Sequence, residues 1–241
     1  MKNFLLFVLF IALIPMSGYS QMFSVDDSSP VRQQQLGTAT VLSIGWEFGD
    51  FDNRNSDLIN IDDYSFNDSV LRLRLENPGL DIGLGLGGAI TGMDNNSYVN
   101  ILARLHNNLN LYMSEERNFL LQLPIQITTD LKRVQQNNTD TEFQQSSFII
   151  GSGIRTVARI SDRFDFSLKA TPNYGFSFSQ GNLFGGSLFR FDGASQLIIN
   201  NVLGNRGLAL GYHFDFRRYD IDGDQNDYDY TSHSISIGIT F

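Results

Sequence analysis

The sequence predicts an all-β fold, an antiparallel up-and-down transmembrane β-barrel of about ten strands. Three observations predict it. Apolar and polar residues alternate along successive segments, short turns and longer polar loops alternate between those segments, and the chain ends on an aromatic residue, Phe241. Alternate side chains of a strand point to opposite faces. In a membrane barrel the apolar face meets lipid and the polar face lines the interior.

The alternation is clearest in the last twelve residues, 230–241. One face of this predicted strand is wholly apolar and the other is small and polar. The two sets are Ile235, Ile237, Ile239 and Phe241, and Ser234, Ser236, Gly238 and Thr240. A soluble sheet could bury such an apolar face against another layer, so this strand alone does not decide its surroundings.

The N-terminus has the features of a secretory signal peptide over residues 1–20. Lys2 supplies a positive start, residues 4–16 are apolar, and residues 17–20 offer small side chains for cleavage before Gln21. The apolar run is shorter than the roughly 20 residues that a spanning helix needs. Because the sequence has no Cys, a lipidated N-terminal cysteine and a disulfide framework are both excluded.

The rest of the chain is expected to hold one domain. Residues 21–37 are polar and lack periodicity, which predicts a periplasmic N-terminal segment, and residues 38–241 form the predicted barrel. The chain has 17 Lys and Arg against 26 Asp and Glu, a formal net charge of −9. An acidic balance argues against a nucleic-acid partner.

The first five predicted strands lie between residues 38 and 130. Their apolar faces are Leu42, Ile44, Trp46 and Phe48; Leu71, Leu73 and Leu75; Leu80, Ile82, Leu84 and Leu86; Val99, Ile101, Ala103 and Leu105; and Leu121, Leu123, Ile125 and Ile127. Asn107 falls on an apolar face, which leaves open a bulge or a turn that would divide its strand. Pro124 cannot donate a ladder hydrogen bond, so regular pairing is also open there.

The last five predicted strands lie between residues 148 and 241. Before the terminal strand their apolar faces are Phe148, Ile150, Ile154 and Ala158; Phe164, Phe166, Leu168, Ala170, Tyr174, Phe176 and Phe178; Phe189, Phe191, Leu197 and Ile199; and Leu208, Leu210, Tyr212, Phe214 and Phe216. Across the chain, short turns at 77–79, 114–118, 161–163 and 204–207 alternate with mostly longer loops at 49–67, 92–97, 135–145, 179–186 and 220–229.

Aromatic residues gather near the ends of these strands, as in the interfacial girdles of membrane barrels. Those toward the loops are Trp46, Phe48, Phe148, Phe176 and Phe178, and those toward the turns are Phe119, Phe164 and Phe241. A lipocalin-like soluble barrel is the alternative fold. It does not predict the signal peptide, the terminal Phe, the alternating loop lengths and the aromatic bands together.

With this ending, signal peptide and spacing of strands and turns, the chain resembles the small outer-membrane β-barrels of Gram-negative bacteria, broadly the OmpA/OmpX-like and PorT-like families. The resemblance implies an integral outer-membrane location among lipid and lipopolysaccharide. It also implies that Phe241 is a signal read by the barrel-assembly machinery. It is a resemblance of architecture, and it implies almost nothing about activity.

Charged residues of both signs lie on the faces that the barrel prediction turns inward. The predicted lumen-lining residues are Arg72, Arg74, Glu76, Asp81, Arg104, Arg155, Asp165, Lys169, Arg190, Asp192, His213, Asp215 and Arg217. A barrel of this size has little lumen, so we expect these charges to pair and to fill it. This favours a structural or surface-binding role. The alternative is a small porin-like channel for ions or small solutes, with the charges lining its pore.

The last loop contains a partial match to a calcium-binding loop. Asp220, Asp222 and Asp224 have the 1-3-5 spacing of an EF-hand, but Gln225 stands at the glycine position and Thr231 at the position of the bidentate Glu. A Ca²⁺ site in this extracellular loop is therefore a candidate beside a simple solvated acidic loop. No other cofactor is expected.

Enzymatic activity is not expected from this sequence. His213 and Asp215 share the predicted inner face, but the sequence has no Gly-x-Ser-x-Gly motif and no histidine-rich metal site to accompany them. A histidine among inward polar residues belongs more often to a structural network. The sequence names no protein partner.

Deletion of Phe241 is expected to lower the amount of assembled protein in the outer membrane more than it lowers the stability of the folded barrel. The residue ends a strand, so its loss removes limited packing, whereas the resemblance makes it a recognition signal. Heat-modifiable migration of the membrane fraction measures assembly, and a refolding titration in detergent measures stability. Normal outer-membrane levels of the truncated chain would contradict this prediction.

Overall fold

The computed structural model describes residues 36–54, 64–136, 142–178, 185–204, 206–221 and 227–241. The chain divides into two units, Met1–Gln33 and Gln34–Phe241. The predicted signal peptide and most of the predicted N-terminal segment lie outside the described residues. Within the described ranges, no helix combines the length and the apolar character needed to cross a membrane.

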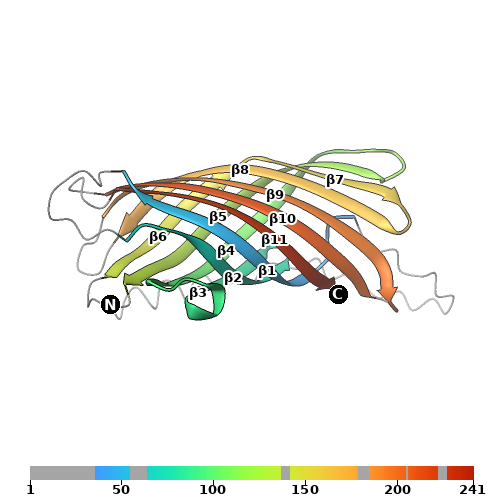
Figure 1. The fold of residues 1–241 in the computed structure, drawn as a ribbon. Helices are drawn as coiled ribbons and strands as arrows, with labels where there is room; N and C mark the ends of the chain where they lie inside the picture. The colour runs from blue at the N-terminus through green and yellow to red at the C-terminus, as the bar shows by residue number, and fades with distance from the viewer. Residues whose placement is uncertain (1–35, 55–63, 137–141, 179–184, 205, 222–226) are drawn as a thin grey trace, which may run out of the picture. The chain divides into compact units, whose positions relative to one another are not determined.

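One antiparallel sheet closes on itself to form the barrel (Figure 1). Its strands are β1 (Val41–Asn53), β2 (Phe66–Asn77), β3 (Leu80–Gly87), β4 (Asn96–Met113), β5 (Phe119–Gln136), β6 (Glu142–Ser152), β7 (Ile154–Ser161), β8 (Phe164–Phe178), β9 (Gly186–Leu203), β10 (Arg206–Ile221) and β11 (Tyr228–Thr240). A short 3-10 helix, η1 (Ala89–Thr91), follows β3. Apart from β6 and β7, strands that are consecutive in sequence are neighbours in the sheet, and β11 returns to pair with β1.

The barrel wall has ten strand positions, because β6 and β7 share one. Both pair with β5 on one side and with β8 on the other. The prediction of ten antiparallel strands in up-and-down order is therefore confirmed. We call the end of the barrel at which the short connections lie the turn end, and the opposite end the loop end.

The break between β6 and β7 falls at Gly153, which the sequence analysis did not single out. The Gly153 N–H donates to the Pro124 carbonyl of β5 at 3.3 Å. A Cβ at Gly153 would lie 2.0 Å from the Ala170 carbonyl oxygen of β8, so only glycine fits this close approach. Pro124 stays within β5, and Asn107 stays within a continuous β4, so neither residue alters the strand count.

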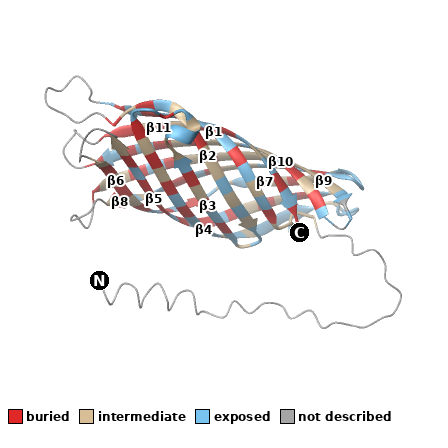
Figure 2. Ribbon diagram, turned by 60° about the horizontal axis from the view of Figure 1, so that its bottom comes forward, coloured by how far each residue is buried: buried red, intermediate tan, exposed pale blue. Residues whose placement is uncertain are grey.

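Side chains alternate along the wall as the barrel prediction requires (Figure 2). On the terminal strand Ile235 and Ile237 are 67% and 51% exposed, whereas Ser234 is buried. On β2, Leu73 is 41% exposed between the inward Arg72 and Arg74. A soluble protein does not expose an apolar surface of this extent. This is the architecture of a small bacterial outer-membrane β-barrel, with apolar side chains outside and polar ones inside.

The aromatic residues predicted near the strand ends lie mostly on the outer surface. Trp46, Phe48, Phe148 and Phe176 are exposed toward the loop end, and Phe119, Phe164 and Phe241 toward the turn end; Phe178 is half-buried. The rings of Phe148 and Phe176 stack across β6 and β8 with centroids 5.7 Å apart.

The strands at the loop end are longer than the sequence analysis predicted. The loop predicted at 49–67 is shortened at both ends, since β1 runs to Asn53 and β2 starts at Phe66. The register continues without interruption to the pairs Phe51↔Phe66 and Asn53↔Tyr228. The prediction ended these strands where outward positions become polar. Backbone pairing continues past that point because it does not require an apolar outer face.

Leu73→Arg is expected to destabilise the barrel by about 2–4 kcal/mol if Leu73 lies near the bilayer midplane, because it places a charge on the lipid face. Leu73→Ala is the control for lost contact area. A folding titration in lipid vesicles measures both variants. An arginine variant no less stable than the alanine variant would contradict the assignment of outer and inner faces.

Candidate functional site

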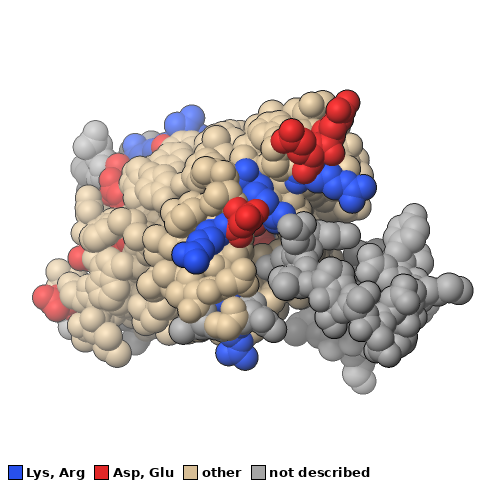
Figure 3. Space-filling view, turned by 90° about the vertical axis from the view of Figure 1, so that its right-hand side faces the viewer, with Lys and Arg blue, Asp and Glu red and all other residues tan. Residues whose placement is uncertain are grey.

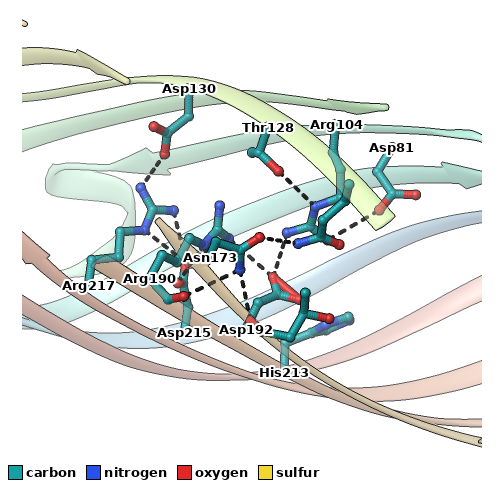
Figure 4. Close-up of polar contacts among 12 residues, drawn as sticks. Asp81, Arg104, Thr128, Asp130, Asn173, Arg190, Asp192, His213, Asp215 and Arg217 are labelled. Carbon is teal, nitrogen blue, oxygen red and sulfur yellow. Dashed lines mark hydrogen bonds and ion pairs between the residues drawn. The ribbon is translucent and has the colours of Figure 1, made fainter. Parts of the chain in front are cut away.

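The barrel interior is the candidate functional site, because the predicted site residues converge there. Its centre is a chain of alternating charges contributed by β4, β9 and β10 (Figure 4). Arg104 donates to Asp192 at 2.5 Å, and Arg190 binds the same carboxylate at 3.3 Å. Arg190 also binds Asp215 at 2.8 Å, and Arg217 binds Asp215 at 2.8 Å. All five side chains are buried. We call this set and its direct partners the ionic network.

The ionic network extends across the lumen to the wall at β5 and to the wall at β3. On the β5 side Arg217 binds Asp130, which also accepts from the Ser147 hydroxyl of β6. On the β3 side Asp81 binds Arg104 and Arg74, each at 3.3 Å. Each carboxylate therefore meets one or two guanidinium groups. Such mutual pairing is the arrangement that makes buried charge tolerable, since an unpaired buried charge is costly.

A branch of charges lies beside β2. Arg74 contacts Glu76 at 2.8 Å and lies 2.8 Å from the Nδ1 atom of His213. Arg72 pairs with Glu47 of β1 at 2.5 Å. The hydroxyl of Tyr230 donates to the same carboxylate at 2.5 Å. Glu47 therefore links the charged interior to Tyr230, one of the aromatic residues that lie toward the loop end.

Aromatic side chains fill the interior toward the loop end. The buried rings are those of Phe51, Tyr64, Phe66, Tyr98, Phe143, Tyr219, Tyr228 and Tyr230, and they belong to one apolar cluster. Phe51 stacks on Tyr228 with centroids 4.4 Å apart and meets Phe143 edge-on at 5.1 Å. Buried rings in mutual contact of this kind pack closely and occupy this part of the lumen. We call these eight residues the aromatic cap.

Lys132 points its ammonium group into the aromatic cap. The Nζ atom lies 3.2 Å from the ring centroid of Tyr230 and 5.2 Å from that of Phe51. The side chain is fully buried. A cation over an aromatic face is stabilised by the ring quadrupole, and more so when both groups are out of water.

The chain crosses the mouth of the barrel at the turn end. The carbonyl of Gly37 accepts from both terminal nitrogens of Arg155 on β7, at 3.4 Å each, and Thr40 accepts from the backbone N–H of Phe241 at 2.9 Å. In the order of strands, β7 lies across the barrel from the β1–β11 pair. Between Gly37, Ala39, Arg155 and neighbouring β8 and β9 residues lies a cavity of about 30 Å³, room for one or two waters.

All thirteen predicted lumen-lining residues are buried or half-buried. The structure brings most of them into the pairs described above, but three differ from the expected mutual pairing. Asp165 binds Arg159, a residue of the same β7–β8 hairpin, at 2.9 Å. Arg155 donates to the Gln122 side chain at 2.9 Å and Lys169 to that of Gln126 at 2.8 Å. Neutral acceptors on β5 stand where carboxylates were expected.

Several important residues were missed by the sequence analysis. Glu47 alternates with the apolar residues Trp46 and Phe48 but was not selected as a lumen-lining residue, and the aromatic cap was not predicted at all. The available signal was the two-residue period itself. Continued from Glu47 through Gly49, it turns Phe51 inward, but the prediction treated the region after Phe48 as a loop.

The calcium prediction stays a prediction. Asp220 is exposed at the end of β10, and Asp222 and Asp224 lie outside the described residues. Among the residues that the structure describes, no group of three or more His, Cys, Asp or Glu could hold a metal ion.

Comparisons with known proteins assign no family. No family model matches the chain, and no curated protein matches it. Solved structures that it matches include the translocator domain of the autotransporter NalP from Neisseria meningitidis, with a TM-score of 0.38, 10% identity, and coverage of 84% of this chain and 88% of that one.

Two further matches are weaker. Ail, the attachment invasion locus protein of Yersinia pestis, has a TM-score of 0.26 and 10% identity, over 85% of this chain and 99% of Ail. The CymD monoaromatic hydrocarbon channel has a TM-score of 0.24 and 9% identity, over 86% and 89%. Likeness at this level carries no argument about function, and the barrel architecture follows from the chain's own strand pairing.

Asp192→Asn is expected to lower the free energy of unfolding by about 3–5 kcal/mol, because it leaves Arg104 and Arg190 short of a buried counter-charge. The matched control is Glu142→Gln, which removes one carboxylate from an exposed pair with Arg133 and should cost less than about 1 kcal/mol. Urea titration in detergent micelles measures both. Equal effects of the two changes would contradict a stabilising role for the ionic network.

Proposed function

We propose that this chain is an integral outer-membrane β-barrel with a closed lumen, and that its role is structural or surface-binding. Outer-membrane lipid and lipopolysaccharide are its proposed surroundings, and the barrel-assembly machinery its proposed partner during insertion. The outward apolar side chains and the closed strand order support membrane insertion, since only a closed barrel or a helix satisfies its backbone in lipid.

One observation carries the proposal of a closed lumen: the interior is occupied along its length. The aromatic cap fills the loop end, the ionic network fills the centre, and the segment from Gly37 to Thr40 crosses the turn end. A pore selective for ions of one sign presents one sign of charge at its narrowest point. Here Arg104, Asp192 and Arg190 alternate in sign across the lumen. A channel would have to displace paired side chains that are costly to separate.

With the lumen closed, the surfaces left for function are the two ends and the lipid-facing wall. At the loop end Arg54 pairs with Asp227 at 3.1 Å and with Asp229 at 3.5 Å, and Arg218 pairs with Asp229 at 3.3 Å. Arg218 and Asp229 lie on paired strand ends, and Arg54 and Asp227 directly adjoin such ends. A rigid base of this kind suits the display of binding loops.

Wild-type protein, purified from the outer-membrane fraction in its heat-modifiable form, is expected to give no stable conductance steps in planar bilayers. The variant Arg104→Ala/Arg217→Ala/Tyr230→Ala, which thins both the network and the cap, is expected to leak. Arg133→Ala is the control, because Arg133 is exposed outside the lumen. Reproducible wild-type steps at neutral pH and moderate salt would overturn the closed-lumen proposal and favour the channel. A chain that stays soluble in the periplasm would overturn the membrane assignment.

A further inference from the structure

Strand β4 extends well past its neighbour β3 at the turn end. The last β3–β4 pair is Leu80↔Leu105, whereas β4 continues for eight residues to Met113. Elsewhere at this end the overhangs are shorter. Strand β7 runs three residues past Ala158, which pairs with Phe119 of β5, and β9 runs four residues past Ile199, which pairs with Phe164 of β8. On its other side β4 stays paired with β5 up to Met113↔Leu120. The segment Asn107–Met113, which we call the β4 edge, therefore has one open side among the described residues.

The open side presents backbone hydrogen-bonding groups. The His106 N–H donates to the Gly79 carbonyl of the β2–β3 turn at 3.0 Å, so residues in phase with His106 point their backbone groups away from β5. By the two-residue period these are Asn108 and Asn110. The position of Pro124 agrees, since it lies opposite Asn108 and no β4–β5 bond needs its missing N–H. A bulge between Asn110 and Tyr112 bends the last turn of the edge.

Apolar side chains accompany this open backbone. Leu109, Leu111, Tyr112 and Met113 are all exposed, with Leu111 at 59% and Tyr112 at 57%. Edges are normally protected by charged residues or proline as well as by bulges, and the β4 edge carries neither a charge nor a proline. In lipid the unpaired backbone groups would be costly, and in water the apolar side chains would be. A strand laid along the edge would pair these backbone groups and cover part of the apolar side chains.

We propose that the β4 edge binds an extended peptide segment of another protein as an added antiparallel strand. Added strands gain affinity from backbone bonds and specificity from alternate side chains. The peptide should carry apolar residues beside Leu109 and Leu111 on the outer face, and small polar residues beside Asn108 and Asn110 on the inner face. Its N-terminal end would lie near the turn at 114–118, where Glu115, Glu116 and Arg117 are exposed with an acidic balance, so a basic residue fits there. Figure 3, which looks on the turn end, shows acidic and basic groups interspersed on this face.

A second copy of the chain does not fit the edge. Two barrels in one membrane would be related by an axis along the membrane normal. Strands of such barrels tilt by about 35–45°, so two facing copies of β4 would cross at about 70–90° and could not form a ladder. A peptide on a separate, extended segment has no such constraint. This inference does not rest on the closed lumen.

The test uses the full mature chain refolded in detergent micelles and a synthetic peptide, Lys-Val-Thr-Val-Thr-Val-Thr. Backbone amide hydrogen exchange is followed by NMR. At saturation, exchange at Asn108 and Asn110 should slow by about tenfold or more. Exchange at Asn107 and Leu109, whose groups already face β5, should change little. A peptide with the same side chains and methylated alternate backbone nitrogens should give no protection.

Two variants separate the backbone from the side chains. Asn108→Pro/Asn110→Pro removes the open-side donors and should abolish binding of the peptide, followed by the fluorescence polarisation of a dye-labelled copy, while Asn108→Ala/Asn110→Ala keeps these donors and should retain binding. Heat-modifiable migration confirms folding of both. Unchanged exchange with the peptide, or equal binding by the proline and alanine variants, would overturn the proposal. Protection that exists without peptide and vanishes when residues 21–33 are deleted would overturn it too, by assigning the edge to the chain's own N-terminal segment.

Discussion

Backbone hydrogen bonding is the constraint on which the rest of this structure depends. A sheet in lipid cannot leave an edge unpaired along its membrane span. This chain meets the requirement by pairing its ten strand positions in order and β11 with β1. Closure then forces the alternation, because every strand has one face toward lipid and one toward a narrow interior. Arg72 and Leu73 lie on opposite sides of the same wall for that reason.

Closure also explains why the interior is so highly charged and why most of its charged groups have partners. Once several arginines and carboxylates point into a lumen of this width, they can only be satisfied by one another or by polar neighbours. Asp192 and Asp215 each contact two guanidinium groups. Arg155, near the mouth, is satisfied by a backbone carbonyl and a side-chain amide instead. The cost of desolvation therefore decides which partners are charged and which are neutral.

Much of the fold could be predicted from the sequence, because the two-residue period is a local signal. The strand number, the lipid-facing set and the inward set all follow from it. The partners of the inward charges could not be predicted. That Arg104 binds Asp192 and not Asp165 depends on the register across β8, β9 and β10, to which no single segment points. The break at Gly153 depends on the approach of the Ala170 carbonyl from β8. The aromatic cap was missed where outward polar residues hid a continuing strand.

The seam between β1 and β11 has a kinetic consequence. It joins Val41 to Thr240 and continues as a ladder of thirteen residue pairs to Asn53↔Tyr228. These partners are separated by most of the chain, and contacts of such long sequence separation form slowly because a large loop must close first. Until β11 pairs with β1, each of these two strands keeps an unsatisfied edge, and a chain with such edges is prone to aggregate. The interval before this seam closes is therefore when the chain most needs protection from aggregation.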